Sequence, residues 1–240
     1  MRHRIKKAMV LAAGYGTRLK PLTDATPKPL VPVAGKPMIE YALEKLIAYG
    51  IEEVVINVSY LKEPLRQYLA GFKRLKVSLS EEPEPLETGG GLRQALPLLG
   101  EEPFFTINSD IIWTDEGAGA LERLNDTWDS SRMEVLLLAQ CKATAIGHDQ
   151  GEDHLFIKPE NTIGWSVAAA PYIVAGLGII HPRLFANAPT GKFSVKLLWL
   201  EALRNGRLFC LPHQGRWFQA GTLADLKQTE ACLAELPTGG

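Results

Sequence analysis

The chain has 240 residues, of which 46% are hydrophobic and 22% charged, with 26 basic against 27 acidic side chains. This length can bury a full core and fits one large α/β domain, and the composition excludes a disordered chain and a surface that coats a polyanion. We therefore expect no nucleic-acid partner, and any site for an anion has to be local.

Apolar runs and amphipathic stretches alternate along the first half of the chain. Short apolar runs that end at turn residues predict strands at 7–12, 54–58, 76–79 and 103–108. Helical spacing of apolar residues predicts helices at 38–49, 63–69, 90–98 and 116–128. Gly50 is placed to cap the first helix. Five prolines fix the backbone of the loop that ends near Pro37, so we predict an extended, stiff segment there.

The second half of the chain continues the alternation less regularly. The predicted strands lie at 133–139, 172–180 and 207–212, and the predicted helices at 193–205 and 223–235. Residues 142–166 show little periodicity and are expected to form a loop or a small hairpin. Because helices separate the strands and each connection is too long for a hairpin, the pattern predicts βαβ units and a parallel sheet. Ligands of such sheets bind beyond the carboxyl ends of the strands.

The sequence carries no mark of export or of a membrane. The apolar run from Ala8 to Ala13 is too short for a signal peptide, and no stretch approaches the roughly 20 apolar residues that cross a bilayer. The three cysteines, Cys141, Cys210 and Cys232, lie far apart and form no CxxC pair, which is typical of thiols in a reducing compartment. We expect a cytoplasmic protein without a membrane partner.

The first predicted strand runs directly into a glycine-rich turn, GYGTR at residues 14–18. A dinucleotide-binding turn needs a third glycine where this chain has Leu19, and a P-loop needs a lysine and a hydroxyl that do not follow in register. What remains is a set of backbone amides, a hydroxyl and a guanidinium, followed by Lys28 between two prolines. Such groups can converge on one triphosphate chain. The alternative is a plain glycine turn beside surface cations.

The segment LAAGYGTRLKPLTDATPKPLVPVAGKPMIEY resembles the opening of the sugar-1-phosphate nucleotidylyltransferases. The likeness continues through EPLETGGGLRQAL, NSD, IIHPRLF and GRWFQAGT, and so covers nearly the whole chain. Within the family, PLETGGG, the short length and the lack of an added acyltransferase or β-helix domain make the chain most similar to the uridylyltransferases that act on N-acetylmuramate 1-phosphate in peptidoglycan recycling.

This resemblance implies a fold as well as a reaction. The fold is a Rossmann-like three-layer α/β/α sandwich around a mostly parallel mixed sheet, in a single domain over residues 1–240. About residues 1–140 would form the nucleotide-binding half. About residues 141–240 would form the sugar-binding half and the C-terminal helix.

In the family's reaction, the phosphate of a sugar 1-phosphate attacks the α-phosphorus of a nucleoside triphosphate, here UTP, and pyrophosphate leaves. Two anions have to meet, and each pair of like unit charges about 4 Å apart costs roughly 4 kcal/mol at an effective dielectric near 20. The site therefore needs cations before it needs an acid or a base. Arg18 and Lys28 are the candidate catalytic residues, and the resemblance implies that Lys28 faces the α-phosphate.

Two glycine-rich segments are expected to hold the nucleotide. In the first turn, the predicted nucleotide-binding residues are Ala12, Ala13, Gly14, Gly16 and Thr17. The second segment, ETGGG, opens a helix, and in related enzymes this loop and a residue just before it read the base. There, Gly89 would let the base lie against the backbone, and either Glu82 or Glu87 would face it. The alternative is a glycine-rich helix start without a ligand.

The resemblance also implies positions for the sugar and for a metal ion. Asn108 and Asp153 match sugar-contacting positions, and Gly176 and Gly178 would let the sugar approach their strand. Mg²⁺ would bridge phosphate oxygens, held by Asp110 and by a second aspartate in a W-x-D-x-G-T pattern. This chain reads WFQAGT, so Gln219 takes that place. Weaker metal binding, help from another carboxylate such as Asp153, and lost activity are all open.

The sequence thus predicts a Mg²⁺-dependent uridylyltransferase that makes UDP-N-acetylmuramate, or a close UDP-sugar, from UTP and the sugar 1-phosphate. A guanylyl- or thymidylyltransferase acting on mannose or glucose 1-phosphate is the alternative within the family. A nucleotide-binding regulatory subunit with impaired catalysis is the alternative from another class, and Gln219 keeps it open. The identity of the sugar, the number of metal ions, and the choice between a monomer and a homo-oligomer are also open.

Overall fold

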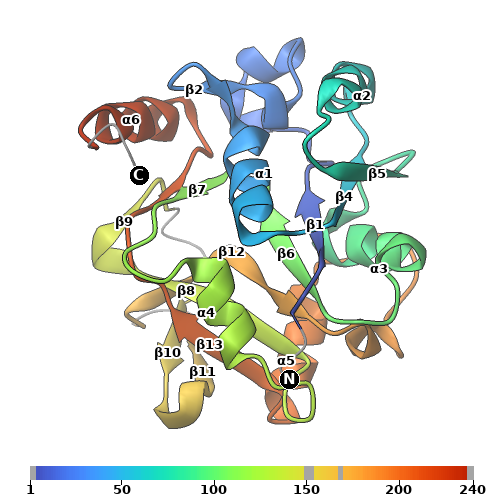
Figure 1. The fold of residues 1–240 in the computed structure, drawn as a ribbon, viewed down its shortest axis with the longest axis vertical. Coiled ribbons are helices and arrows are strands. Elements are labelled where there is room, and N and C mark those ends of the chain that lie inside the picture. Colours follow the sequence, from blue (N-terminus) through green and yellow to red (C-terminus); the bar gives the residue numbers. More distant parts are fainter. Residues whose placement is uncertain (1–3, 149–153, 167–169, 237–240) are drawn as a thin grey trace.

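The computed structural model describes residues 4–148, 154–166 and 170–236, and a large sheet lies at its centre (Figure 1). The strands of this sheet are β1 (Lys7–Leu11), β4 (Glu53–Val58), β5 (Lys76–Glu81), β6 (Phe104–Asn108), β8 (Val135–Cys141), β10 (His154–Ile157), β11 (Ile163–Ser166), β12 (Tyr172–Ile180) and β13 (Leu208–Pro212). They follow the order β11-β10-β12-β6-β1-β4-β5, and β8 joins β12 to β13. Only the pairings of β12 and of the β10–β11 hairpin are antiparallel. The predicted mostly parallel mixed sheet is confirmed.

Helices cover both faces of the sheet. They are α1 (Met38–Tyr49), α2 (Lys62–Gly71), α3 (Glu87–Leu99), α4 (Ala120–Thr127) and α5 (Lys196–Arg204), whereas α6 (Leu223–Ala234) packs against a small second sheet. One buried cluster joins the sheet to α1, α2 and α4, and a second cluster joins it to α3 and α5. These clusters form the two interfaces of a three-layer α/β/α sandwich, so the predicted architecture is confirmed.

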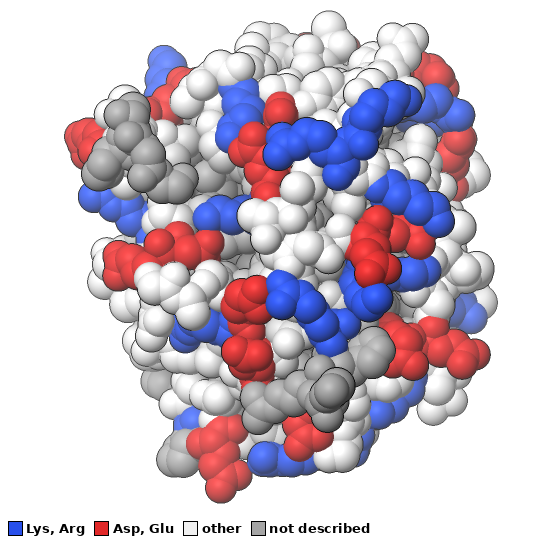
Figure 2. Space-filling view, in the orientation of Figure 1, with Lys and Arg blue, Asp and Glu red and all other residues white. Residues whose placement is uncertain are grey.

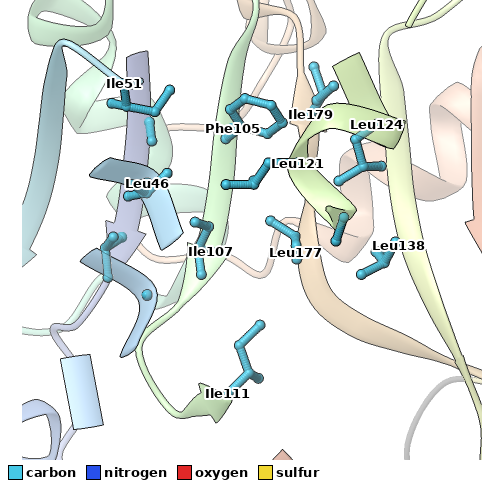
Figure 3. Packing of buried hydrophobic residues seen from close by; sticks show 14 of the residues in the cluster. Leu46, Ile51, Phe105, Ile107, Ile111, Leu121, Leu124, Leu138, Leu177 and Ile179 are labelled. Carbon is cyan, nitrogen blue, oxygen red and sulfur yellow. The ribbon is translucent and has the colours of Figure 1, made fainter. Parts of the chain in front are cut away.

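The two clusters lie on opposite faces of the sheet, because successive side chains along each strand point to opposite faces. In β6, Phe105 and Ile107 belong to the first cluster and Phe104 to the second. Figure 3 shows Leu46 of α1 and Leu121 of α4 on the same side of the sheet as Phe105 and Ile107. Because both faces are buried, these strands read as continuous apolar runs, which is why the sequence pattern located them.

A small second sheet lies beyond the carboxyl end of β6. Its strands are β7 (Ile111–Trp113), β14 (Trp217–Gln219) and β9 (Ala145–Ile146). β14 pairs antiparallel with β7, which places Gln219 opposite Ile111. Thr222 then caps α6, accepting a hydrogen bond from the Asp225 amide (3.2 Å) while Asp225 accepts one from the Thr222 amide (2.8 Å). The last part of the chain is thereby fixed beside the end of β6.

The loop after β1 differs from the extended segment that its prolines predict. It winds through single 3₁₀ turns at Thr17–Leu19, Leu22–Asp24 and Lys28–Leu30, then forms the hairpin of β2 (Pro32–Val33) and β3 (Lys36–Pro37). Proline fixes φ near the value that the first turn of a helix also needs, so proline excludes a long helix but not a single turn. The prediction of an extended segment was therefore wrong, because this loop contains single helical turns.

Helix α4 starts later than its predicted start at Glu116. The segment before it turns at Gly117, where φ is +71°, and the Asp115 carboxylate accepts a hydrogen bond from the Ala120 amide (2.8 Å). The helix therefore begins at Ala120. The strand β7 was not predicted because three residues are too few to show a period. The β10–β11 hairpin confirms the small hairpin expected within residues 142–166.

Basic and acidic side chains are interspersed over the face shown in Figure 2, as the balanced composition leads us to expect. Among the described residues, no helix has both the length and the apolar character that crossing a bilayer requires. The division into a nucleotide-binding and a sugar-binding half stays a prediction.

Candidate functional site

Two adjoining cavities lie where the carboxyl ends of β1, β4 and β6 meet. The first, here called the loop cavity, measures about 210 Å³, and its lining includes Ala13, Gly14, Lys28, Glu87 and Asp110. The second, here called the sheet cavity, measures about 390 Å³, and its lining includes Thr106, Gly176, Lys196, Trp217 and Gln219. Leu11, Thr88 and Asn108 line both cavities. The arrangement offers two neighbouring compartments at the edge where sheets of this kind bind ligands.

A buried ion pair lies on the wall of the loop cavity. The Lys28 ammonium nitrogen is 2.5 Å from an Asp110 carboxylate oxygen, and the two side chains are only 15% and 14% exposed. Burial alone raises the pKa of the Asp110 carboxyl, but the charge and hydrogen bond of Lys28 oppose this effect. With a hydrogen bond from Gln219 and the charge of Arg18, they lower the pKa below its usual value. Asp110 is therefore an ionised oxygen donor at neutral pH.

Gln219 reaches Asp110 because β14 pairs with β7. The Ala220 amide donates to the Asp110 carbonyl (3.0 Å), so the backbones of the two segments are joined beside the side-chain contact. Gln219 also lines the sheet cavity, so its contact with Asp110 links the two cavities. The structure thus brings together the two residues predicted to hold a metal.

Arg18 approaches this group from the first loop. A Cβ atom built on Gly221 would lie 3.4 Å from an Arg18 guanidinium nitrogen, so the guanidinium lies against the segment that follows Gln219. Its charge acts on Asp110. Arg18 is exposed and does not line the loop cavity. Both predicted catalytic cations therefore act on the charge of Asp110, and of the two Lys28 lines the loop cavity.

The oxygen donors of this site suit Mg²⁺. Asp110 offers carboxylate oxygen and Gln219 amide oxygen, and both are hard ligands. Among the described residues, no group of three or more His, Cys, Asp or Glu side chains is arranged to hold a metal ion. Mg²⁺ is usually bound by one or two carboxylates together with substrate phosphates, so a single carboxylate in a phosphate site fits this ion.

A buried polar network under the loop cavity was not predicted from the sequence. Asn57 accepts a hydrogen bond from the Ala12 amide (2.7 Å) and donates one to Glu82 (2.7 Å). The other Glu82 oxygen accepts from the Leu86 amide (2.8 Å). Asn57 is 3% exposed and Glu82 1% exposed. The signal in the sequence was the single polar residue within VVINV, directly before the carboxyl end of β4.

This network bears on two predicted nucleotide-binding residues. Glu82 lines the loop cavity, but its two carboxylate oxygens already accept hydrogen bonds, one from Asn57 and one from the Leu86 amide at the start of α3. The Ala12 amide likewise donates its hydrogen bond to Asn57, so Ala12 would contact a ligand through its other groups. Of the two candidate glutamates, Glu87 is the more exposed, and its nearest described cation is Lys192 at 3.9 Å. The geometry therefore favours Glu87 as the side chain that faces the cavity.

The glycines of the first turn have different surroundings. Gly14 lines the loop cavity, and a Cβ atom there would meet nothing within 4 Å. At Gly16, φ is +65°, and a Cβ atom would lie 2.9 Å from Thr23 and 3.0 Å from Lys28. Gly16 thus lets the loop close tightly around Lys28. Neither Gly16 nor the exposed Thr17 lines the loop cavity.

Two other predicted glycines pack against protein. A Cβ atom on Gly89 would overlap the Phe193 ring, and the Gly89 amide donates to the Phe193 carbonyl (2.9 Å). A Cβ atom on Gly178 would lie 2.6 Å from the Leu136 carbonyl in the neighbouring strand. Neither residue lines a cavity at this site. Gly176, the other glycine expected to face the sugar, has a φ of +68°, lines the sheet cavity and lies against Asn108.

The structure therefore gathers most of the predicted site. The predicted residues that line the two cavities are Ala12, Ala13, Gly14, Lys28, Glu82, Glu87, Asn108, Asp110, Gly176 and Gln219. Asp153 lies outside the described residues. The individual roles of these residues in binding remain predictions. Sequence reasoning missed Asn57, Thr88 and Lys196 as residues that line the cavities.

Comparison with known proteins gives consistent matches. The model of the Nucleotidyl transferase family matches residues 7–147. The chain is 37% identical to the N-acetylmuramate alpha-1-phosphate uridylyltransferase of Caulobacter vibrioides, over 96% of this chain and 98% of that protein. It is 33% identical to the protein of the same name from Neisseria meningitidis, over 94% of this chain and 97% of that protein.

A solved structure supports the same fold. The chain superposes on a UDP-glucose pyrophosphorylase complexed with UDP-glucose with a TM-score of 0.82, over 96% of this chain and 99% of that chain. The sequences are 18% identical, so this likeness concerns the fold alone.

The network around Glu82 predicts a stability effect. In Glu82→Gln, an amide NH₂ group replaces one of the two accepting oxygens and faces a donor, either the Asn57 side chain or the Leu86 amide. We expect a loss of about 1–3 kcal/mol in the free energy of unfolding, measured by urea denaturation. Glu84→Gln, on an exposed side chain two residues away, should change it by less than about 0.5 kcal/mol. Equal effects of the two substitutions would contradict the proposed network.

Proposed function

We propose, since this chain belongs to the nucleotidyl transferase family, that it transfers a uridylyl group from UTP to N-acetylmuramate 1-phosphate and releases pyrophosphate. The observation that carries this proposal is the pair of adjoining cavities, joined at the contact between Asp110 and Gln219. The loop cavity would hold the nucleotide and the sheet cavity the sugar. The two relatives that bear the name of this activity align over nearly the whole chain.

The reaction requires little proton chemistry. A phosphate oxygen of the sugar 1-phosphate forms a bond to the α-phosphorus of UTP, and the bond from that phosphorus to the pyrophosphate oxygen breaks. The nucleophile is already ionised at neutral pH, because the second pKa of a phosphate monoester is about 6. A general base is therefore not needed. The main task of the protein is to align two anions and to offset their repulsion.

Lys28 and Arg18 supply the positive charge for this task. Lys28 lines the loop cavity beside Gly14, where the space above the glycine is open to a phosphate chain. We assign to Lys28 the stabilisation of charge that builds on the α-phosphoryl group, and to Arg18 the phosphates at the border of the cavity. The backbone of Ala13 and Gly14 and the side chain of Glu87 would hold the nucleotide.

Asp110 and Gln219 are the residues that would hold Mg²⁺. When bound, the ion would neutralise phosphate charge and polarise the phosphoryl oxygens. Because Gln219 contributes no charge, we propose that the ion depends on the phosphates of the substrates more than in a site with two carboxylates.

For the cellular setting, we propose the cytoplasm and a role in peptidoglycan recycling. The three cysteines are free thiols, as a reducing compartment would keep them. The role rests on the likeness to the N-acetylmuramate enzymes.

A panel of substrates tests the proposed reaction. Pyrophosphate release should be fastest with UTP and N-acetylmuramate 1-phosphate when UTP, GTP, dTTP and CTP are each combined with N-acetylmuramate, N-acetylglucosamine, mannose and glucose 1-phosphates. Turnover with GTP or dTTP and a hexose 1-phosphate alone would replace the uridylyl assignment. Tight UTP binding with no product from any pair would instead indicate a regulatory subunit.

Replacing Lys28 tests the source of the positive charge. In Lys28→Ala, kcat should fall about 10²- to 10³-fold, because one preorganised charge at the α-phosphoryl group is lost. Lys20→Ala removes an exposed lysine that also precedes a proline in the same loop, and kcat should stay within about twofold. Steady-state kinetics measures both, with the thermal unfolding midpoint as a check of folding. An unchanged kcat in Lys28→Ala would refute the assigned role.

Introducing a carboxylate at position 219 tests the metal site. We expect Gln219→Asp to bind Mn²⁺ at least about tenfold more tightly, since a second negative ligand is added beside Asp110. Calorimetric titration of the nucleotide-free protein measures this affinity without reference to activity. Gln214→Asp makes the same change on an exposed residue and should leave the affinity unaltered. Equal affinities in the wild type and Gln219→Asp would argue against a metal at this position.

A further inference from the structure

We propose that a ring contact between Tyr15 and Tyr60 positions three backbone amides of the first loop for the phosphates of the nucleoside triphosphate. The inference rests on the proposed function, and it names what holds the nucleotide-binding loop in place before the nucleotide arrives. Tyr15 itself does not line the loop cavity, although Ala13 and Gly14 before it do. It is therefore a positioning residue, which acts through the backbone of its own segment.

The amides of residues 13–15 have no partner within the described parts of the protein. None of the hydrogen bonds there has the amide of Ala13, Gly14 or Tyr15 as its donor. Backbone amides are strong donors, and successive unpaired amides in a turn can form a concave site for an anion. Two of the three residues line the loop cavity, so these donors lie where the triphosphate is proposed to bind.

Hydrogen bonds fix the first loop on both sides of these amides but not between them. On one side, the Ala12 amide donates to Asn57 (2.7 Å). On the other side, the Gly16 carbonyl accepts from the Thr23 hydroxyl (2.8 Å). Between these anchors, glycine at position 14 adds backbone freedom. A side-chain contact is therefore the interaction that can keep the intervening amides in one conformation.

Tyr15 makes such a contact with Tyr60. The two ring centroids lie 5.6 Å apart and the ring planes are inclined by 57°, which is within the range of favourable aromatic pairs. Tyr60 follows the end of β4, the strand whose Asn57 already accepts the Ala12 amide. One strand end thus contacts the first loop twice, once on each side of Ala13 and Gly14.

Two features indicate that this contact serves the loop rather than the core. Tyr15 is 50% and Tyr60 37% exposed, so the two rings bury little area. Leu61, directly after Tyr60, has a φ of +50°, a left-handed conformation that residues other than glycine seldom adopt. Such conformations cost free energy and occur mainly where the surroundings fix them, often near ligand sites. The backbone beside Tyr60 is therefore held in place.

Binding of UTP and of uridine to the full chain tests the inference. In Tyr15→Ala and in Tyr60→Ala, the Kd of UTP, measured by calorimetry, should rise about 3- to 10-fold, the range expected for the loss of an aromatic pair. The Kd of uridine, measured by NMR titration, should stay within about twofold, because uridine has no phosphate for the amides to bind. Tyr15→Phe keeps the ring and should bind UTP as the wild type does.

The double variant and a control separate this role from others. Tyr15→Ala with Tyr60→Ala should bind UTP as weakly as either single variant, because each one alone breaks the same contact. Leu22→Ala shortens another exposed side chain of the first loop and should leave the Kd of UTP within about twofold. Additive losses in the double variant, equal losses for UTP and uridine, or no loss of UTP binding would each overturn the inference. If Tyr60→Ala lowers the thermal unfolding midpoint, Tyr15→Ala and Tyr15→Phe decide.

Pyrophosphate release, measured separately, keeps the proposed function distinguishable. UTP binding that depends on both tyrosines, without release in the presence of any sugar 1-phosphate, would refute the proposed reaction and support this inference. Release from UTP with N-acetylmuramate 1-phosphate, together with UTP binding unaffected by either substitution, would support the reaction and refute the inference. If the wild type binds GTP and not UTP, GTP and guanosine replace UTP and uridine, because the inference concerns the phosphates and not the base.

Discussion

The ion pair of Lys28 and Asp110 is the interaction on which the site depends. A carboxylate buried to this extent is costly without a partner, and removing one member of a buried pair typically costs about 3–5 kcal/mol. Compared with well-packed apolar residues, the ion pair adds little net stability, so its main effect is to fix the position of the Lys28 side chain. It holds a mobile lysine side chain of the first loop against the end of β6. Gly16 allows this closure because its backbone adopts a positive φ beside Lys28.

The sheet supplies the fixed frame around that pair. Parallel strands β1, β4 and β6 end at one edge, so residues from distant parts of the sequence meet there without further adjustment. Asn57 and Glu82 then join the strand ends to the start of α3 through buried hydrogen bonds. Rigid support of this kind lets a site hold charges in position before the substrates arrive.

Much of the fold could be predicted because its elements have a period that local sequence reveals. The helix Met38–Tyr49 agrees at both ends with its prediction, since its apolar residues share one face and Gly50 ends it with a positive φ. The cavity walls were harder to predict. Whether a glycine faces a ligand or a neighbour depends on register, so Gly176 and Gly178 could not be distinguished before the irregular pairing of β12 with β8 was known. Asn57 was missed because apolar residues surround it in the sequence of its strand.

The pairing of β14 with β7 has a consequence for how the protein comes into being. Gln219 can reach Asp110 only after β14 has been synthesised, which is later than the first loop and the strand before Asp110. A nascent chain therefore carries the cations of the site well before it carries the complete pocket. The candidate site is complete only when β14 has paired with β7.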